Sequence, residues 1–278
     1  RKDVLIVNMS LLGVTRHIDS YKEKINEAIP MPSSIDYPYK EVFYAKIQKG
    51  RESDCINAIK EIKGKNESPE NIRLPINTNI IPVKDLIEWK DKDILSSINF
   101  KMKSKNIYQN DIALLDILAN FNWERPLYFI NSYQTLNKFS DMMDYIQYQG
   151  VVSRLVPFNT NQEQVNIDKS YDLLMNKYSY SNIKNIQETD QRFVSSMCAP
   201  AYSQLATNLL NNGEYDKAIL VADKYFKTFP TPTKWDYLLV TSSEMMNVYV
   251  RMNQENEYYR IDEMIKTCTK KKDELESL

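Results

Sequence analysis

The fold is decided over residues 110–130, which read NDIALLDILANFNWERPLYFI. The side chain of Asn110 can accept backbone hydrogen bonds and so cap the first turn of a helix. Apolar residues then recur at helical spacing, at Ile112, Leu115, Leu118 and Ala119. After Pro126, the compact apolar run 127–130 is typical of a buried strand. The stretch therefore predicts a helix that leads into a buried strand, as in proteins whose helices pack on a sheet.

The residues on either side of this stretch continue the alternation. The patterns predict, in order, a strand over 3–9, a helix over 15–29, a strand over 41–47 and a helix over 53–62. Residues 64–83 contain three prolines and several asparagines, so we expect an irregular crossing with one or two short edge strands. A second buried strand is predicted over 151–156. Residues 1–160 are therefore expected to form a mixed α/β domain with a small sheet.

Strand patterns stop after this domain. From Asp168 onward the period is helical, and the first apolar stripe consists of Tyr171, Leu174, Met175 and Tyr178. The sequence therefore predicts an all-α region over residues 161–278, so that the whole chain belongs to the α+β class.

One part of the helical region has the spacing of a TPR unit. Residues 199–230 place Ala206 and Ala218 where two helices approach closely, and Gly213 where the chain turns between them. A second hairpin is expected from residues 234–252 and 255–271. Because repeats bury their faces by stacking, we expect these hairpins to be TPR-like and to serve packing or partner contact.

Composition excludes several classes of function. The chain has 36 basic and 37 acidic residues, a net charge of -1, whereas nucleic-acid binding needs a basic excess on one face. No run approaches the roughly 18 to 20 apolar residues of a membrane helix. Since the chain begins at Arg1 without a methionine, we expect it to be a soluble piece of a larger protein.

Few residues are available for familiar chemistry. The five glycines stand far apart, so no phosphate loop or dinucleotide motif can be written. His17 is the only histidine, which leaves no His-rich metal site, and its helical position favours a surface side chain over a catalytic one. Cys55, Cys198 and Cys268 fit neither a metal site nor a disulfide framework, and we expect buried thiols. No cofactor or metal is predicted.

Two groups of side chains are candidates for a site. Asp141 and Asp144, with Glu124 near in sequence, could act as paired carboxylates, although acidic residues beside a helix are usually solvated or paired with a neighbour such as Arg125. An aromatic-rich neighbourhood could stack on a sugar or could simply pack in the core; it consists of Trp123, Tyr128, Tyr133, Tyr145 and Tyr148.

The run from Asn122 to Phe129, Asn-Trp-Glu-Arg-Pro-Leu-Tyr-Phe, carries a resemblance to a known family. Together with several shorter stretches that occur in the same order, this run resembles the soluble C-terminal region of the bacterial domain-of-unknown-function family 2723. The members of that family are multi-spanning membrane proteins similar to GT-C protein O-mannosyltransferases. The other matching stretches are 3–4, 8–12, 114–118, 149–150, 154–157, 171 and 174–178. Two positions depart from the family: Arg16-His17 replaces a Trp-Tyr pair, and Ser153 replaces an aromatic residue.

The resemblance implies a role outside the chemical step. The catalytic carboxylate and the lipid-linked donor site would lie in a membrane part that this sequence lacks, so no catalytic residue carries over. The chain would sit on the periplasmic face of the inner membrane, tethered through transmembrane segments, and contact its own membrane domain and an acceptor polypeptide or glycan. A carbohydrate-binding module and a free-standing carboxylate-dependent periplasmic enzyme are the alternatives.

Four residues of the matching motifs are predicted to be structural. Trp123 and Pro126 immediately precede the buried strand 127–130, which makes Trp123 an expected core anchor. Arg125 and Arg154 stand beside predicted buried strands, where a guanidinium commonly bridges carboxylates and loop carbonyls.

Overall fold

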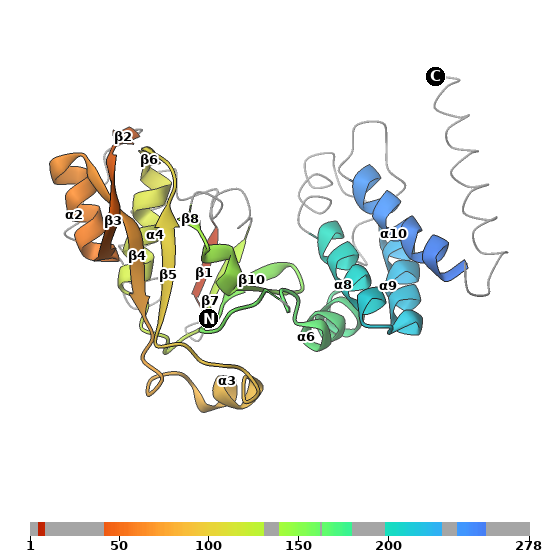
Figure 1. Cartoon of the computed structure of the whole chain (residues 1–278). Helices are drawn as coiled ribbons and strands as arrows, with labels where there is room; N and C mark the ends of the chain where they lie inside the picture. The colour runs from red at the N-terminus through yellow and green to blue at the C-terminus, as the bar shows by residue number, and fades with distance from the viewer. Residues whose placement is uncertain are drawn as a thin grey trace, which may run out of the picture. The chain divides into compact units, whose positions relative to one another are not determined.

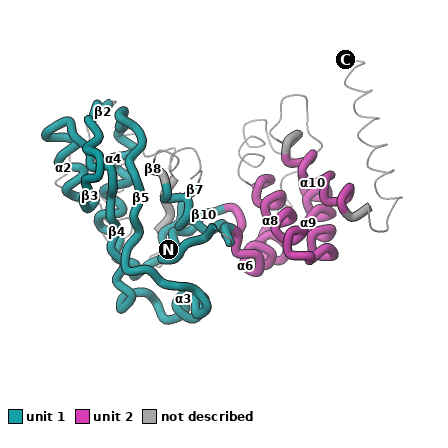
Figure 2. Tube along the Cα trace, in the orientation of Figure 1, with its two compact units in different colours: residues 1–148, 152–164 teal, residues 149–151, 165–278 magenta. Residues whose placement is uncertain are grey.

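A computed structural model divides the chain into two compact units, coloured in Figure 2. Unit 1 comprises residues 1–148 and 152–164, and unit 2 comprises residues 149–151 and 165–278. The structure describes residues 5–8, 42–130, 139–161, 163–179, 198–229 and 238–253. In this part of the chain, unit 1 contains both strands and helices and the main elements of unit 2 are helices (Figure 1), which confirms the predicted α+β class.

The first of two four-stranded sheets has the strand order β3-β4-β5-β8. The strands are β3 (Lys46–Asp54), β4 (Glu67–Pro75), β5 (Ser97–Met102) and β8 (Phe139–Ser140). β3 and β4 are parallel and are connected by α2 (Cys55–Lys65), while β5 runs antiparallel to β4. The Asp54 carboxylate accepts a 2.8 Å hydrogen bond from the Asn57 amide and so caps α2.

The second sheet contains the buried strand that the sequence predicts over residues 127–130. Its order is β1-β7-β10-β9, with β1 (Leu5–Asn8), β7 (Leu127–Ile130), β10 (Val152–Leu155) and β9 (Ile146–Gln149). β1 is parallel to β7, and β10 is antiparallel to it. Leu127 and Phe129 are fully buried. The strands predicted over 3–9, 127–130 and 151–156 are confirmed.

α4 (Gln109–Ala119) supplies much of the core of unit 1. Its residues from Ile112 to Leu118 are all buried, and all but Asp116 are apolar, so apolar side chains cover more than one face of the helix. The Asn110 cap was wrong: the cap is Tyr108, two residues earlier, and its backbone amide donates a 2.8 Å hydrogen bond to the Asp111 carboxylate. β2 (Val42–Tyr44) and β6 (Asn106–Tyr108) form a separate antiparallel ribbon.

Two strand predictions were wrong in detail. The strand expected over 41–47 is two strands, β2 and β3, separated by Ala45. The crossing expected over 64–83 contains β4, a nine-residue strand paired on both sides. Pro69 is tolerated there because it lies where the β3–β4 register shifts and before the pairing with β5 begins. The helix expected over 15–29 lies outside the described residues.

Unit 2 is centred on a helical hairpin. α8 (Ala199–Asn211) and α9 (Tyr215–Thr228) are joined at Gly213, whose φ of +75° is the left-handed conformation that glycine adopts without strain. Ala206 and Ala218 are fully buried in one core cluster with residues of α10 (Leu238–Asn253). The hydroxyl groups of Tyr225 and Ser242 lie 2.9 Å apart and link α9 to α10. Pro230 and residues 255–271 lie outside the described part of the chain.

The start of unit 2 contains a π-helix. α6 (Ile167–Tyr171) continues into η3 (Asp172–Lys177), which closes with a 2.8 Å hydrogen bond from the Tyr178 amide to the Leu173 carbonyl. Gly150 packs beneath this turn with a φ of +65°, and a β-carbon at this position would stand 3.0 Å from the Tyr178 hydroxyl. The Gln-Gly motif at 149–150 is therefore a close-packing site.

Candidate functional site

The predicted acidic cluster is only partly assembled. Asp141 immediately precedes η2 (Met142–Tyr145) and Asp144 lies within it, and the Lys101 ammonium lies 3.9 Å from the Asp141 carboxylate. Burial, followed by the negative charge of Asp141, raises the pKa of Asp144. Glu124 exchanges hydrogen bonds with Asn122, and no contact between Glu124 and either aspartate is found among the described residues. The structure thus pairs the two aspartates without joining Glu124 to them.

The predicted aromatic neighbourhood does not form an exposed platform in the described residues. Tyr128, Tyr145 and Tyr148 are half-buried, and Tyr133 lies outside the described part. Burial, with the charges of Asp144 and Asp141, raises the pKa of Tyr145. Exposed tyrosines occur instead on the β2–β6 ribbon, at positions that the sequence analysis did not single out.

Trp123 is the centre of the Asn-Trp motif and is 4% exposed. Its indole nitrogen donates a 3.0 Å hydrogen bond to the Pro75 carbonyl at the end of β4, and its ring lies 4.7 Å from that of Phe121. Its φ is +67°, a conformation that is costly for a bulky residue. Burial and the hydrogen bond offset this strain, so the side chain fixes the turn that precedes β7. Arg125 and Pro126 are half-buried in this turn.

Arg154 lies in the interior of unit 1. It is 2% exposed, and its guanidinium lies 2.8 Å from the Asp85 carboxylate and 3.8 Å from that of Glu88. The same group stands over the Trp89 ring at 4.6 Å and over the Tyr128 ring at 5.8 Å. A charge so deeply buried is tolerated only when it is paired. Arg154 therefore ties β10 to α3 (Val83–Glu88), which carries both acidic partners.

The two described cysteines differ in environment. Cys55, at the start of α2, is buried, and burial raises the pKa of its thiol to about 12, which keeps it protonated and unreactive. Cys198 is only half-buried, so the expectation of a buried thiol was wrong at that position. Cys268 and His17 lie outside the described part of the chain.

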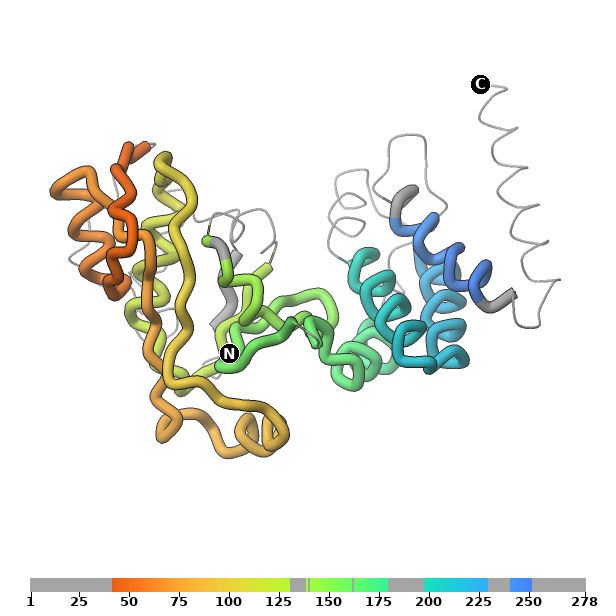
Figure 3. Tube along the Cα trace, viewed as in Figure 1, coloured from red at the N-terminus to blue at the C-terminus, as the bar shows by residue number. Residues whose placement is uncertain are grey.

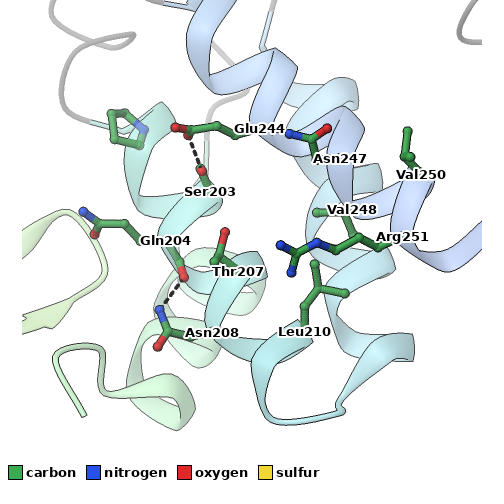
Figure 4. Close-up of a pocket in the computed structure, with 11 residues that line it drawn as sticks. Ser203, Gln204, Thr207, Asn208, Leu210, Glu244, Asn247, Val248, Val250 and Arg251 are labelled. Carbon is green, nitrogen blue, oxygen red and sulfur yellow. Dashed lines mark hydrogen bonds between the residues drawn. The ribbon is translucent and has the colours of Figure 1, made fainter. Parts of the chain in front are cut away.

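Unit 2 contains an open groove between α8 and α10, with a volume of about 670 Å³ (Figure 4). The α8 wall presents Ser203, Gln204, Thr207 and Asn208. The α10 wall presents Glu244, Asn247, Val250 and Arg251. Within each set the residues are adjacent or are three or four positions apart, which places them on one helix face.

The contacts across the groove define its chemistry. Leu210 and Val248 line it as buried apolar residues. The Ser203 hydroxyl donates a hydrogen bond to Glu244 and thereby bridges the two walls. The Asn208 side-chain amide donates a 2.8 Å hydrogen bond to the Gln204 backbone carbonyl, and its side-chain oxygen can still accept one. Arg251 points from α10 towards α8, and no carboxylate of the described residues pairs with it.

The sequence analysis did not single out this groove. The available signal was the spacing of uncharged polar residues at 203, 204, 207 and 208, followed by polar or charged residues at 244, 247 and 251. This spacing resembles any solvated helix face, and only the packing of α10 beside α8 turns it into a site.

Other site types have no support in the described residues. No group of three or more His, Cys, Asp or Glu side chains is placed to hold a metal there. Among the helices of the same residues, none has the length and apolar character needed to cross a membrane.

Comparison with known proteins gives one match. Residues 38–172 match the family described as TMEM260-associated domain 2. The matched range contains Trp123 and Arg154 and ends within η3, so the groove between α8 and α10 lies beyond it. No curated protein and no solved structure matches the chain.

Proposed function

We propose that this chain is a non-catalytic, periplasmic part of a GT-C-like membrane glycosyltransferase, and that its helical unit docks polypeptide. The resemblance of residues 122–129 to family 2723 supports the first half of the proposal, and the groove between α8 and α10 is the observation that carries the second. The partners would be the protein's own membrane domain and an acceptor polypeptide. A purely supporting role for unit 2 is the competing interpretation.

A TPR-like arrangement supports a docking role. In such repeats the first helices of successive hairpins line one face. α8 is the first helix of the described hairpin, and α10 follows α9 in the position of the next first helix. The groove would then be the inner face of the array, where extended partners bind.

The lining of the groove suits a peptide backbone. Gln204, Asn208 and Asn247 offer amide groups that can donate to carbonyls and accept from N–H groups. With Glu244 engaged by Ser203, Arg251 is the cation available to an acidic side chain of the partner. One cation is too little for nucleic acid, which requires several phosphate contacts.

A peptide array tests this proposal. The probes are synthetic peptides that differ only in their number of acidic residues, and the chain is compared with an Asn208→Ala/Asn247→Ala variant. We expect the variant to bind all peptides about tenfold more weakly, since two backbone contacts are lost. Arg251→Ala should weaken the acidic peptides alone.

Leu220→Ala, on the exposed side of α9, is the matched control and should bind like the parent chain. Equal binding by the parent chain and the double variant would contradict polypeptide docking and favour a supporting role for unit 2.

A carbohydrate-binding role has one specific observation in its favour. Tyr44 and Tyr108 are 71% and 41% exposed. In the β2–β6 register, Tyr44 is opposite Asn106 and Val42 is opposite Tyr108, so both rings project from the same face of the ribbon. Exposed aromatic faces of this kind can pack against sugar rings.

A glycan array discriminates this candidate from the first. Loss of glycan binding in Tyr44→Ala and Tyr108→Ala, with binding retained in Tyr215→Ala, would support it. Tyr215 is equally exposed but lies on α9. The absence of glycan binding by the parent chain would eliminate it.

A further inference from the structure

The charges in the groove between α8 and α10 lie at two separate points. The two helices are in contact, although α9 comes between them in the chain (Figure 3). Of the eleven side chains that line the groove, Glu244 and Arg251 are the charged ones. Both belong to α10 and are seven positions apart, which is about two helical turns. They therefore lie on the same helix face, separated by about 10.5 Å along the helix axis, and give the groove an acidic end and a basic end.

The acidic end is held in position by a hydrogen bond. Ser203 is 6% exposed and donates its hydroxyl to Oε2 of Glu244. A carboxylate accepts several hydrogen bonds, so Oε1 of Glu244 can still accept one from a cation. Glu244 is exposed and is therefore accessible to the side chain of a partner. Because one oxygen is already fixed, less conformational entropy would be lost when a cation binds.

The basic end is formed by Arg251. Figure 4 shows its guanidinium near Leu210, away from the contact between Ser203 and Glu244. A guanidinium offers five N–H donors and can bind a carboxylate through two of them. Asn247 lies about one helical turn from each charged residue and offers a neutral amide between them. A partner that uses both ends must therefore span this polar stretch.

The separation of the charges favours an extended polypeptide over smaller partners. In an extended chain of the polyproline type, residues i and i+3 lie on the same side about 9 Å apart, which is close to the separation in the groove. A free amino acid has its two charges only about 3 Å apart and cannot reach both ends. Sugar rings commonly pack on aromatic side chains, and in the described part of the chain no aromatic residue lines the groove.

We propose that the groove binds an extended polypeptide segment that carries a basic and an acidic residue three positions apart. The basic side chain pairs with Glu244, the acidic side chain pairs with Arg251, and the backbone between them contacts Asn247. This inference rests on the proposed docking of polypeptide and adds the charge pattern that the partner must carry. Both pairs are accessible to solvent, so each should strengthen binding only about threefold.

Binding of synthetic peptides to the whole chain tests this charge pattern. All peptides are acetylated and amidated, so that only side chains are charged. One carries lysine and glutamate three positions apart and is made in both orders, because the direction of the bound peptide decides which charge comes first. The others carry the two residues adjacent to each other, lysine alone, glutamate alone, or neither. We expect the better order of the spaced peptide to bind about tenfold more tightly than the neutral peptide and about threefold more tightly than the adjacent one.

Salt and two variants assign the charges to the ends of the groove. The advantage of the spaced peptide should largely disappear in 1 M NaCl, where charges are screened beyond about 3 Å. Glu244→Gln keeps an oxygen that can accept from Ser203 and should remove the advantage that lysine gives. Arg251→Gln should remove the advantage that glutamate gives. The matched controls, Asp216→Asn and Lys227→Gln, change exposed residues of α9 outside the groove and should leave both advantages intact.

The neutral peptide separates this inference from the proposed function. Its binding should be unchanged in all four variants, which also shows that they fold. If the charged and neutral peptides bind equally, or the spaced and adjacent peptides bind equally, the charge pattern is overturned while polypeptide docking stands. Equal losses in the groove and control variants would also overturn the pattern. If none of the peptides binds, polypeptide docking itself fails.

Discussion

Unit 1 and unit 2 use their polar side chains in opposite ways. Unit 1 buries Arg154 at 2% exposure and pairs it with Asp85, and it buries Trp123 with its indole bonded to Pro75. Unit 2 keeps Thr207, Asn247 and Arg251 exposed along an open groove. In unit 1 the residues of the distinctive sequence motifs are buried and contribute to packing. In unit 2 the accessible polar residues belong to no recognisable sequence motif. Substitutions in the two units should therefore separate stability from binding.

The largest effect is expected at Arg154. Arg154→Ala leaves the buried Asp85 without its partner, and the free energy of unfolding should fall by about 5 kcal/mol. Urea unfolding measures the loss. Arg154→Met/Asp85→Leu removes both charges and should recover most of it; a double variant as unstable as the single one would contradict the importance of the unpaired carboxylate.

Trp123→Ala should cost about 4 kcal/mol, because a buried aromatic ring and its hydrogen bond are lost. Trp123→Gly is the informative control, since glycine adopts the positive φ of this position without strain. Thermal melts should show the glycine variant to be the more stable of the two. If Trp123→Ala melts like the parent chain, the core has been placed wrongly.

Gly150→Ala should lower stability by about 2 kcal/mol, because it combines a positive φ with a tight contact to the Tyr178 hydroxyl. Gly150→Ala in a Tyr178→Phe background separates the two causes by guanidinium unfolding. We expect Tyr178→Phe to reduce the destabilisation by Gly150→Ala only in part. If it removes the destabilisation completely, the positive φ of residue 150 contributes nothing to it.

Asp144 should give a smaller, pH-dependent effect. Its pKa is raised in the folded state by burial and by Asp141, so folding favours the protonated carboxyl. This contribution is fully present below the unfolded-state pKa and is lost as the pH rises through the folded-state pKa. Asp144→Asn should therefore raise the melting temperature at pH 7, and the gain should vanish near pH 3, below the usual aspartate pKa of about 3.9. A gain independent of pH would point to another cause.

The smallest effect on stability is expected in the groove. Asn247→Ala replaces an exposed side chain and should change the free energy of unfolding by no more than about 0.5 kcal/mol. The same variant should weaken peptide binding. A large loss of stability, measured by urea unfolding, would make Asn247 a structural residue and erase the contrast between the units.

Local pattern predicted the elements whose signals were strong. The buried strand 127–130 and the helix–turn–helix around Gly213 lie where their sequence places them. The length and central position of β4 were missed because Pro69 and Pro75 suggested short edge strands. Pro69 is accommodated by the register shift between β3 and β4, and Pro75 is accommodated because it ends the strand. The site was harder still: Glu124 is near Asp141 in sequence, but its hydrogen bonds lead to Asn122.

The sequence by itself determined the class of the chain, the burial of Trp123 and of the strand that follows it, and the low content of catalytic residue types, because composition and short-range periodicity express these directly. Only the tertiary structure decided that Arg154 meets Asp85, that α10 closes a groove with α8, and that Ile80, Val83 and Ile87 remain in water. The first two outcomes bring together residues that are far apart in sequence, and the third depends on which side of a segment the rest of the unit covers. Local propensity sets none of these outcomes, because each depends on how the helices and strands bury one another.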